Sequence, residues 1–530
     1  MGSKTNLVNL DAMIERSDFA MQSSEDSSYE NVATISLRDF MEAGLTGQLL
    51  RKPDFQRETN HWKPDQVFSL LECFVNGDLI PSVILWRSNT FLFVIDGCHR
   101  LSVLKAWIYD DYGDGKLSYE YFGREISQSQ KAAATITRNL INSNIGSWKS
   151  FELKLKNIQK SIDPVKDLQD IQKLQTVASR GVPIQWVKGD VEKAESSFFK
   201  INTEGTPLDS TEELLLRHRK RPIPIAARAV IRAATGHEYW SYFPEEVASS
   251  IKKEAKELHH KIFEPDLKHS VVRTLDLPLG GSQGVRSALK TLIDLMLMAN
   301  KKQDGKPISV GDYAEDLSGA ETLKVLKNTL KLIERVTGNG NGSLGLHPAV
   351  YFYGESGRHS IPMFMGTIQL VSERIRNNDG PFFAKFIRAR QELEESLIVH
   401  KEVISQILQG YVNKTRIEKY KAMLESCIHH ILEGKKIDDQ FLVEVSGKKG
   451  KVLSSERKCN PGRQFSNNQK SFIFIKDSLS TALRCPICNG YIDSAKSVSY
   501  DHIKPLREGG QSDEENCQIT HPYCNQSIKK

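Results

Sequence analysis

The chain has 530 residues, of which 39% are hydrophobic and 26% are charged, and its formal net charge is +6. This composition is typical of a globular protein with two to four domains, and it excludes collagen-like and largely disordered chains. No apolar run reaches the ~18 residues of a membrane span. The eight cysteines do not form a disulfide framework, so we expect a reduced, cytoplasmic protein without membrane contacts. The mildly basic balance suits a polyanionic partner without requiring one.

A polar tail, an amphipathic helix and a hairpin are predicted at the start of the chain. Residues 1–33 are polar and acidic, which predicts a flexible tail. Pro64 suits the first turn of a helix, and Gly77 suits the residue at which a helix ends. The apolar runs 82–86 and 91–95 are separated by a short polar link, and this pattern predicts the two strands of a hairpin.

The second of these strands leads into the motif Asp96-Gly-Cys-His-Arg100, after which a helix is predicted. A strand that breaks at glycine and feeds a helix presents free backbone N–H groups and the positive end of the helix dipole to an anion. Arg100 in the first turn would add a fork for a phosphate. The alternative is that Asp96 and His99 cap and pin the helix without any ligand.

Three motifs in this order resemble the DGQHR-type branch of the ParB/sulfiredoxin-like superfamily. They are Phe55-Gln-Arg57 with a following Trp62, then Ile80-Pro81, then Asp96-Gly-Cys-His-Arg100. Members occur in GmrSD-type and phosphorothioate-sensing phage-defence proteins, where the domain is associated with nucleotide binding or hydrolysis and with sensing of modified DNA. Cys98 stands where the family commonly has Gln or Glu. The resemblance implies a site shaped by Gln56 and formed by these nucleotide-binding residues: Arg57, Asp96, Gly97, His99 and Arg100.

The next segment continues this resemblance. Residues 110–123 predict a loop and a short strand, and the spacing of apolar residues from 128 to 180 predicts helices with a break at Ile162-Asp-Pro164. Residues 195–208 resemble a family segment downstream of the DGQHR motif. The resemblance implies that Asn202 binds the nucleotide from a polar turn between two helices, as a lid over the phosphates. A turn that only caps the next helix is the alternative.

From 210 to 442 the chain is predicted to be mostly helical. The glycine-rich run Gly338-Asn-Gly-Asn-Gly342 follows no strand, so it predicts a flexible turn rather than a phosphate loop. The aromatic segment 347–359 suits a packed loop between helices or a pocket for a base or a modified sugar. One apolar stripe in the last helix is expected in the core, namely Ile417, Tyr420, Leu424, Cys427, Ile428 and Ile431. The predicted helices are 212–219, 244–261, 285–300, 321–336, 363–376, 382–408 and 414–432.

Two pairs of metal-ligating residues lie near the end of the chain, after a basic linker (446–470) that would attract phosphates. Cys485 and Cys488 have the spacing of a zinc knuckle, and His521 and Cys524 repeat it. Three thiolates and one imidazole form a common structural Zn²⁺ site. A short segment with little apolar content needs such a site to fold.

Between the two pairs lie a β-prone run at 498–503, a Gly509-Gly510 turn and Asn516, and a short helix is predicted from Pro522. This order resembles the ββα-metal fold of HNH nucleases, which usually have Cys where this chain has His521. An imidazole can accept a proton at neutral pH, and hard cations prefer oxygen ligands. The resemblance implies that His502 is the general base and that Asp501 and Asn525 are ligands for Mg²⁺ or Mn²⁺. It also implies that Asn516 orients the loop that holds the base. The alternative is a zinc knuckle that only binds.

The sequence therefore predicts an α+β protein with a ParB/sulfiredoxin-like domain, a helical middle and an HNH domain. We expect a DNA endonuclease of a phage-defence or modification-dependent restriction system, gated by nucleotide or DNA-modification sensing. Its predicted partners are DNA, including modified phage DNA, and a nucleoside triphosphate. A homo-oligomer, a non-catalytic DNA-binding regulator and a nucleoside triphosphatase with a docking knuckle stay open as alternatives. The expected segments are 1–33 (tail), 34–225 (ParB-like), 226–445 (helical), 446–470 (linker) and 471–530 (HNH).

Overall fold

The structure is a computed structural model, and the chain divides into two compact units. The first contains Met1–Arg219 and Thr235–Tyr239, and the second contains Lys220–Ala234 and Trp240–Lys530. The described residues are 7–19, 32–54, 56, 58–60, 62–123, 126–158, 168–204, 210–267, 270–281, 285–301, 308–447 and 464–528.

The first unit is built on a mixed sheet with the strand order β1-β3-β5-β4-β6-β2. The predicted hairpin is confirmed, because β4 and β5 pair antiparallel. Strand β6 pairs parallel with β4 and antiparallel with β2, and Pro183 lies opposite Thr34. The strands are β1 (Arg16–Ser17), β2 (Thr34–Ser36), β3 (Leu50–Pro53), β4 (Val83–Arg87), β5 (Leu92–Asp96) and β6 (Gly181–Val187).

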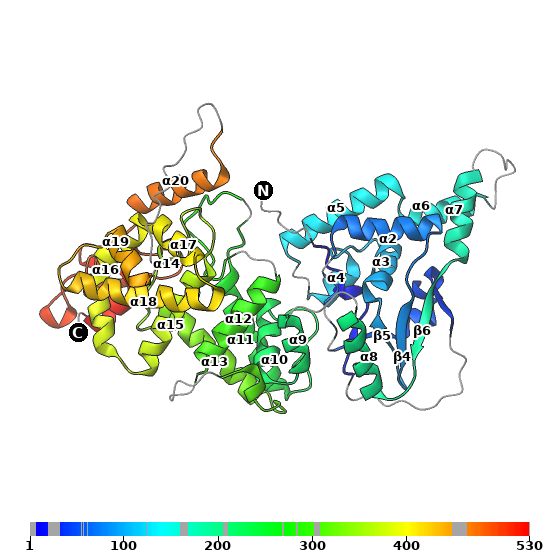
Figure 1. The fold of residues 1–530 in the computed structure, drawn as a ribbon, viewed down its shortest axis with the longest axis horizontal. Helices are drawn as coiled ribbons and strands as arrows, with labels where there is room; N and C mark the ends of the chain where they lie inside the picture. The colour runs from blue at the N-terminus through cyan, green and yellow to red at the C-terminus, as the bar shows by residue number, and fades with distance from the viewer. Residues whose placement is uncertain are drawn as a thin grey trace. The chain divides into compact units, whose positions relative to one another are not determined.

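Alternation along the hairpin strands gives the sheet two buried faces. Successive side chains of a strand point to opposite faces, so Leu92 and Val94 enter one apolar cluster while Phe93 and Ile95 enter another. The first cluster also contains residues of α2 (Pro64–Asn76) and α3 (Cys98–Tyr109), and the second contains Phe198 of α8 (Val191–Glu204). The strands β4, β5 and β6 lie beside α3 and α8 (Figure 1). The motif Asp96-Gly-Cys-His-Arg100 therefore lies where a central strand leaves the sheet.

Helices and 3-10 turns account for most of the rest of the first unit. The helix expected from Pro64 begins there and ends at Gly77, whose φ is 85°. Residues 116–121 form a helix, so the short strand predicted within 110–123 is wrong. The helical elements of the first unit are the 3-10 turns η1 (Asp11–Met13) and η2 (Leu37–Phe40) and the helices α1 (Leu45–Leu49), α2 (Pro64–Asn76), α3 (Cys98–Tyr109), α4 (Lys116–Tyr121), α5 (Gln128–Asn144), α6 (Trp148–Ile158), α7 (Leu168–Ser179), α8 (Val191–Glu204) and α9 (Ser210–Arg217). The expected break at 162–164 lies outside the described residues.

The second unit is a helical assembly that ends in a small strand pair. The helix predicted over 382–408 is interrupted at His400, which ends α16 and precedes α17. Its helices are α10 (Pro222–Ile231), α11 (Glu245–Phe263), α12 (Val285–Ala299), α13 (Ala320–Val336), α14 (Pro348–Tyr351), α15 (Ile361–Arg376), α16 (Gly380–Val399), α17 (Lys401–Gln409), α18 (Asn413–Leu432), α19 (Asp439–Ser446) and α20 (Asn467–Ser480). The remaining elements are the 3-10 turns η3 (Val310–Asp312) and η4 (Leu506–Glu508), the strands β7 (Ser499–His502) and β8 (Cys517–Thr520), and the π-helical turn η5 (Cys524–Ile528).

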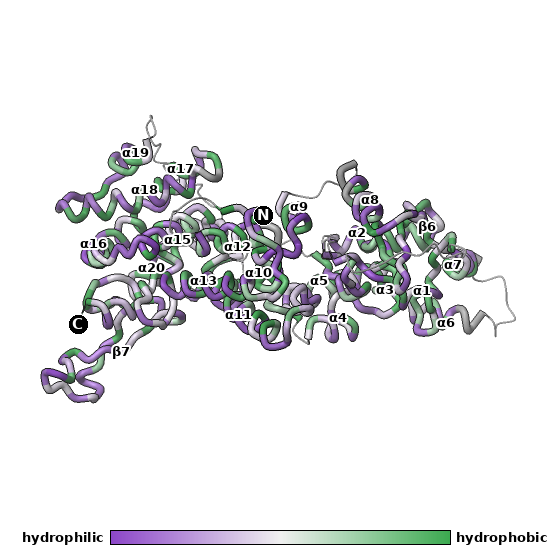
Figure 2. Tube along the Cα trace, turned by 90° about the horizontal axis from the view of Figure 1, so that it is seen from below, coloured by the Kyte–Doolittle hydropathy of each residue, from purple (hydrophilic) through white to green (hydrophobic). Residues whose placement is uncertain are grey.

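The helical core of this unit is formed by amphipathic helices, and polar and apolar residues alternate along α18 (Figure 2). Tyr420, Leu424 and Cys427 on the predicted stripe of α18 are at most 2% exposed. Tyr351 and Tyr353 of the aromatic segment are each 1% exposed, so these rings are packed in the core as the packed-loop interpretation expects.

The predicted α+β class is confirmed. Among the described helices, none has the length and apolar content that crossing a membrane would require.

Candidate active site

The four predicted metal ligands come together in a buried cluster of the second unit. One ligand atom from each of Cys485, Cys488, His521 and Cys524 lies within 4.8 Å of every other. Nδ1 of His521 is 3.3 Å from Sγ of Cys488 and 4.0 Å from Sγ of Cys524. A tetrahedral site with bonds of about 2.0–2.3 Å requires ligand atoms roughly 3.3–3.8 Å apart. The cluster therefore fits a structural metal.

The tautomer of His521 is fixed by its second nitrogen. Nε2 lies 2.9 Å from the carbonyl oxygen of Tyr491, and only a protonated nitrogen can donate to that oxygen. The lone pair of a neutral ring is then on Nδ1, which faces the sulfurs. Burial, together with the positive charge of Arg390, lowers the pKa of His521. Both effects favour the neutral imidazole that a metal requires.

A buried ion pair of α16 joins the knuckle to the helical core. Arg390 and Glu394 have fully buried side chains, and Nε of Arg390 donates to Oε1 of Glu394 at 2.7 Å. Oε2 of Glu394 accepts from the backbone N–H of Tyr491 at 2.6 Å. A Cβ on Gly490 would collide with the Arg390 guanidinium, which explains a glycine two residues after the first ligand pair.

The Asp-His pair lies on the strand pair between the two ligand pairs. Strands β7 and β8 pair antiparallel, with Asp501 opposite Gln518 and His502 opposite Cys517. Asp501 is 8% exposed, and its Oδ2 accepts from Nε2 of Gln518 at 2.8 Å. His502 is half-buried, and its Nε2 lies 3.0 Å from Oγ of Ser512. Because the two residues are consecutive on a strand, their side chains leave opposite faces.

Asn516 holds the loop that leaves β7. Its Oδ1 accepts from the backbone N–H of Lys504 at 2.7 Å, and its Nδ2 donates to the carbonyl oxygens of Lys504 and Gln511. Its backbone carbonyl also accepts from the N–H of Ile503. A Cβ on Gly510 would meet Nδ2 of Asn516 at 2.8 Å, so the glycine turn allows this close approach.

Asn525 contacts β7, the strand that carries Asp501 and His502. It belongs to η5, one residue after the ligand Cys524. Its Nδ2 donates to Oγ of Ser499 at 2.9 Å and to the carbonyl oxygen of Tyr500 at 3.0 Å. The short helix predicted from Pro522 begins there, and it brings Asn525 next to the strand that carries Asp501 and His502.

The glycine-rich run 338–342 differs from its prediction. It was expected to be a flexible turn, but it forms hydrogen bonds to residues 497, 498 and 526 of the segment that carries the Asp-His pair. Sequence analysis had no signal for this, because contacts between residues about 160 positions apart leave no local pattern.

In the first unit, the motif Asp96-Gly-Cys-His-Arg100 forms the predicted junction of strand and helix. Gly97 precedes α3 with a φ of 93°, and a Cβ there would collide with Val83. Nη2 of Arg100 donates to Oδ2 of Asp96 at 2.6 Å and to the carbonyl oxygen of Ser82 at 3.1 Å. The guanidinium is thus paired with Asp96 in this structure. The ring of His99 stacks on Trp62 at 5.3 Å.

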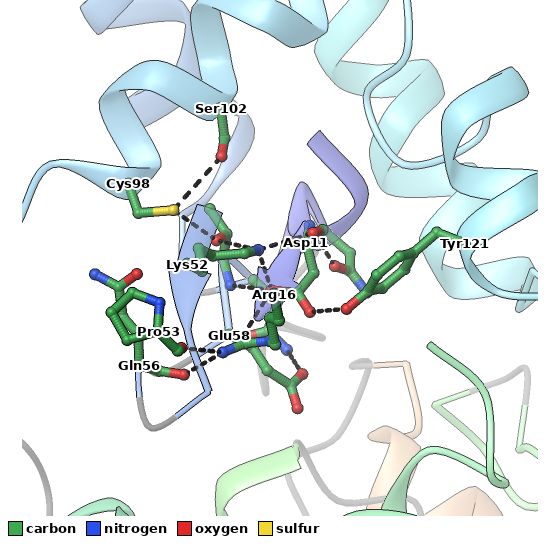
Figure 3. A network of polar contacts seen from close by, with 12 residues as sticks. Asp11, Arg16, Lys52, Pro53, Gln56, Glu58, Cys98, Ser102 and Tyr121 are labelled. Carbon is green, nitrogen blue, oxygen red and sulfur yellow. Dashed lines mark hydrogen bonds and ion pairs between the residues drawn. The ribbon is translucent and has the colours of Figure 1, made fainter. Parts of the chain in front are cut away.

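A buried polar network holds the segment that follows β3 beside the strand that ends at this motif (Figure 3). Asp11 accepts from Nη2 of Arg16 at 3.0 Å and from Nζ of Lys52 at 2.7 Å, and all three side chains are at most 1% exposed. Arg16 also donates to the carbonyl oxygen of Gln56. Gln56 in turn donates to the carbonyl oxygen of Ile95 at 3.3 Å. The network therefore connects the start of the chain with the strand that ends at the motif. The prediction of a flexible tail over residues 1–33 is wrong for residues 7–19, which pack into the first unit and contribute η1 and β1.

Of the predicted nucleotide-binding residues, Asn202 is not placed as expected. Arg57 lies outside the described residues. Asn202 belongs to the last turn of α8, so the prediction that it lies in a polar turn between helices is wrong. The helix continues through Glu204 because Glu195 to Glu204 contains no strong helix breaker.

Several residues that hold these side chains carry little signal in the sequence. Gln518 and Ser512 contact Asp501 and His502, and the pair Arg390 and Glu394 supports the knuckle. The only sequence signal was the spacing of Arg390 and Glu394, which are four apart on a helix.

Two family models match parts of the chain. Residues 485–530, which include the strand pair and the ligand cluster, match the model described as HNH endonuclease. Residues 37–218 match the model described as GmrSD restriction endonuclease, N-terminal domain. Searches of curated proteins and of solved structures found no match. The chain thus carries a GmrSD N-terminal domain and a C-terminal HNH endonuclease domain, and this combination supports a nuclease of a restriction system.

Proposed function

We propose that this chain is a metal-dependent DNA endonuclease of a prokaryotic anti-phage or modification-dependent restriction system. In this proposal the N-terminal unit gates the nuclease by sensing a nucleotide or a DNA modification. One observation carries the nuclease part: Asn525 is hydrogen-bonded to the strand that bears Asp501 and His502. A general base and two oxygen ligands thereby share one small scaffold beside a buried ligand cluster.

His502 is proposed to accept a proton from the attacking water. The oxygen of that water forms a bond to phosphorus while the bond from phosphorus to the 3′ oxygen breaks. The half-buried position of His502 lets water reach its ring, and its contact with Ser512 restricts the orientation of the ring. A positioned imidazole of this kind typically contributes about 10²–10⁴-fold to the rate.

Asp501 and Asn525 are proposed to hold one Mg²⁺ or Mn²⁺ through oxygen atoms. Gln518 fixes the carboxylate of Asp501, and the amide nitrogen of Asn525 is bonded to β7. The amide oxygen of Asn525 then lies on the side away from those bonds. There it is available to a hard cation, which prefers oxygen ligands. When bound, the cation offsets negative charge on the phosphate and on the leaving oxygen.

The cluster of three thiolates and one imidazole is proposed to bind Zn²⁺ in a structural role. All four protein ligands are buried, which leaves no open coordination position for a substrate. In this role the metal joins the segment before β7 to η5.

The N-terminal unit is proposed to bind a nucleoside triphosphate at the start of α3. Asp96, Gly97, His99 and Arg100 surround a helix N-terminus, which favours an anion. A bound phosphate would compete with Asp96 for the guanidinium of Arg100, because the same Nη2 atom contacts the carboxylate. Roles for Arg57 and Asn202 in this site rest on the family resemblance.

The proposal is tested by incubating plasmid and phage DNA, with and without base modifications, with the full chain. Each reaction contains Mg²⁺ or Mn²⁺, with or without each nucleoside triphosphate, and is repeated with His502→Ala. We expect cleavage by wild type only. Dependence on modification or nucleotide identifies what the N-terminal unit senses, and the ratio of nicked to linear plasmid distinguishes single-strand from double-strand cutting.

A folded, metal-loaded protein that binds DNA but never cleaves it would instead indicate a DNA-binding regulator. Turnover of a nucleoside triphosphate without DNA cleavage would indicate a nucleoside triphosphatase with a docking knuckle.

A further inference from the structure

We propose that the loop Gly338–Gly342 of the helical domain is a positioning element for the nuclease site, with Asn339 and Asn341 as positioning residues. This inference rests on the proposed endonuclease function. It assigns a role to residues that lie outside both matched domains. The loop follows α13 and is called the clamp loop below.

The first part of the clamp loop holds the entry into β7. Oγ of Ser497 donates to the carbonyl oxygen of Gly338 at 2.7 Å. The backbone N–H of Val498 donates to Oδ1 of Asn339, also at 2.7 Å. Val498 directly precedes β7, and it lies three residues before Asp501 and four before His502. Ser497 is fully buried, which makes its contact with Gly338 part of the packed structure.

The second part of the clamp loop holds η5. The side-chain amide of Gln526 is bonded at both ends, because its Nε2 donates to Oδ1 of Asn341 at 2.8 Å and its Oε1 accepts from the N–H of Gly342 at 3.0 Å. Gln526 is the neighbour of Asn525. The same short loop therefore contacts η5, which carries Asn525, and the two residues that lead into β7, which carries Asp501.

The clamp loop is anchored in the helical core. Arg335, in the last turn of α13, donates to the carbonyl oxygen of Gly342 and lies over the rings of Phe383 and Tyr523 at 4.8 and 5.0 Å. The backbone N–H of Tyr523 donates to the carbonyl oxygen of Ser343 at 2.9 Å. The clamp loop thus connects the packed helix α13 with η5 and with the residues that lead into β7.

This arrangement matters for catalysis because the proposed metal ligands lie on β7 and η5, and the clamp loop bonds to both regions in addition to the direct hydrogen bonds of Asn525 to β7. Metal binding by two residues on different elements requires those elements to keep a fixed separation, and a displacement of about 1 Å can reduce a rate by ~10²-fold. Asn339 and Asn341 do not touch the proposed site. We therefore expect their loss to lower kcat and the affinity for the divalent cation, while the KM for DNA stays unchanged.

The experiment uses the full chain and compares replacements at the two asparagines. Asn339→Leu combined with Asn341→Leu removes both side-chain acceptors while keeping a side chain of similar branched shape. Asn339→Asp combined with Asn341→Asp keeps an oxygen acceptor at each position. Gly340→Ala is the matched control, because a Cβ there meets nothing within 4 Å. Cleavage rates are measured over a Mn²⁺ titration, together with zinc content and thermal unfolding.

We expect the leucine pair to lower kcat by about tenfold and to raise the half-activating Mn²⁺ concentration by a similar factor. The aspartate pair and Gly340→Ala should stay within about twofold of wild type, and zinc content should be equal in all variants. A leucine pair with wild-type kinetics would overturn the inference, as would an aspartate pair as defective as the leucine pair. Loss of zinc or a lowered melting temperature in the leucine pair would also overturn it, because the clamp loop would then be only structural. If wild type itself never cleaves DNA, the proposed function fails instead.

Discussion

The buried pair Arg390 and Glu394 gives the sharpest prediction about how the nuclease domain is held. Replacing Arg390 with leucine removes the partner of a carboxylate that is 0% exposed. It also removes the donors to the carbonyl oxygens of Leu344 and Gly345, which lie 2.6 and 2.9 Å from the guanidinium nitrogens. The variant therefore leaves one charge and two carbonyl groups buried without these partners.

The expected loss follows from these contacts. Breaking a buried ion pair by removing one partner destabilises a protein by about 3–5 kcal/mol. Each buried carbonyl left unpaired adds roughly 1 kcal/mol or more. We expect Arg390→Leu to lower the free energy of unfolding of the second unit by about 4 kcal/mol or more. Because Glu394 also accepts from Tyr491 beside the knuckle, zinc should be released more readily as well.

The assay is urea unfolding followed by far-UV circular dichroism, with zinc release to a chromogenic chelator measured on the same preparations. Arg388→Leu is the matched control, since Arg388 lies on the same helix but is exposed, and exposed substitutions typically stay within about 0.5 kcal/mol. The double variant Arg390→Leu with Glu394→Leu should recover part of the loss, because it removes the unpaired charge. An Arg390→Leu variant within about 1 kcal/mol of wild type, with normal zinc retention, would refute this reasoning.

Three further predictions concern the metal cluster, acid stability and the N-terminal unit. Gly345→Ala should weaken zinc binding in a chelator competition, because the new Cβ would lie 2.8 Å from the ring of His521 at a φ of 57°; unchanged affinity would contradict this. Burial lowers the pKa of His347 to about 3 and that of His359 to about 4, so between about pH 4 and 6.5 the unfolded chain binds more protons than the native one. The free energy of unfolding of the second unit should therefore fall as the pH is lowered through this window, by up to ~1.4 kcal/mol per pH unit for each histidine, and a flat profile between pH 7 and 5 would contradict it. Asp11→Asn should destabilise the N-terminal unit by about 3–5 kcal/mol in urea unfolding, because it leaves two buried cations without their carboxylate, and a loss below about 1 kcal/mol would show that the network is not needed.

The sequence predicted best those features that have a local pattern. The spacing of Cys485, Cys488, His521 and Cys524 was sufficient to predict one metal cluster, because ligand type and spacing together restrict the geometry. The hairpin at 83–96 and the helix from Pro64 also followed from local alternation and capping.

Features that depend on distant contacts could not be predicted. Strand β6 contains Pro183, which weakens any local strand signal, yet it pairs with both β4 and β2. The run Gly338–Gly342 resembles a free turn in sequence, and only the folded chain brings it against residues 497 and 526. The short helix at Lys116–Tyr121 gave too few residues for its period to be recognised.

The central claim is that His502 on β7 is the general base of a DNA-cleaving site. Its most direct test is single-turnover cleavage at saturating Mn²⁺ by wild type, His502→Ala and His429→Ala, with DNA affinity and zinc content measured on the same preparations. His429 is the control because its side chain is 78% exposed and it lies on α18. We predict that His502→Ala loses at least about 10²-fold in rate while DNA affinity and zinc content are unchanged, and that His429→Ala cleaves like wild type. A His502→Ala variant that cleaves at the wild-type rate would contradict the account.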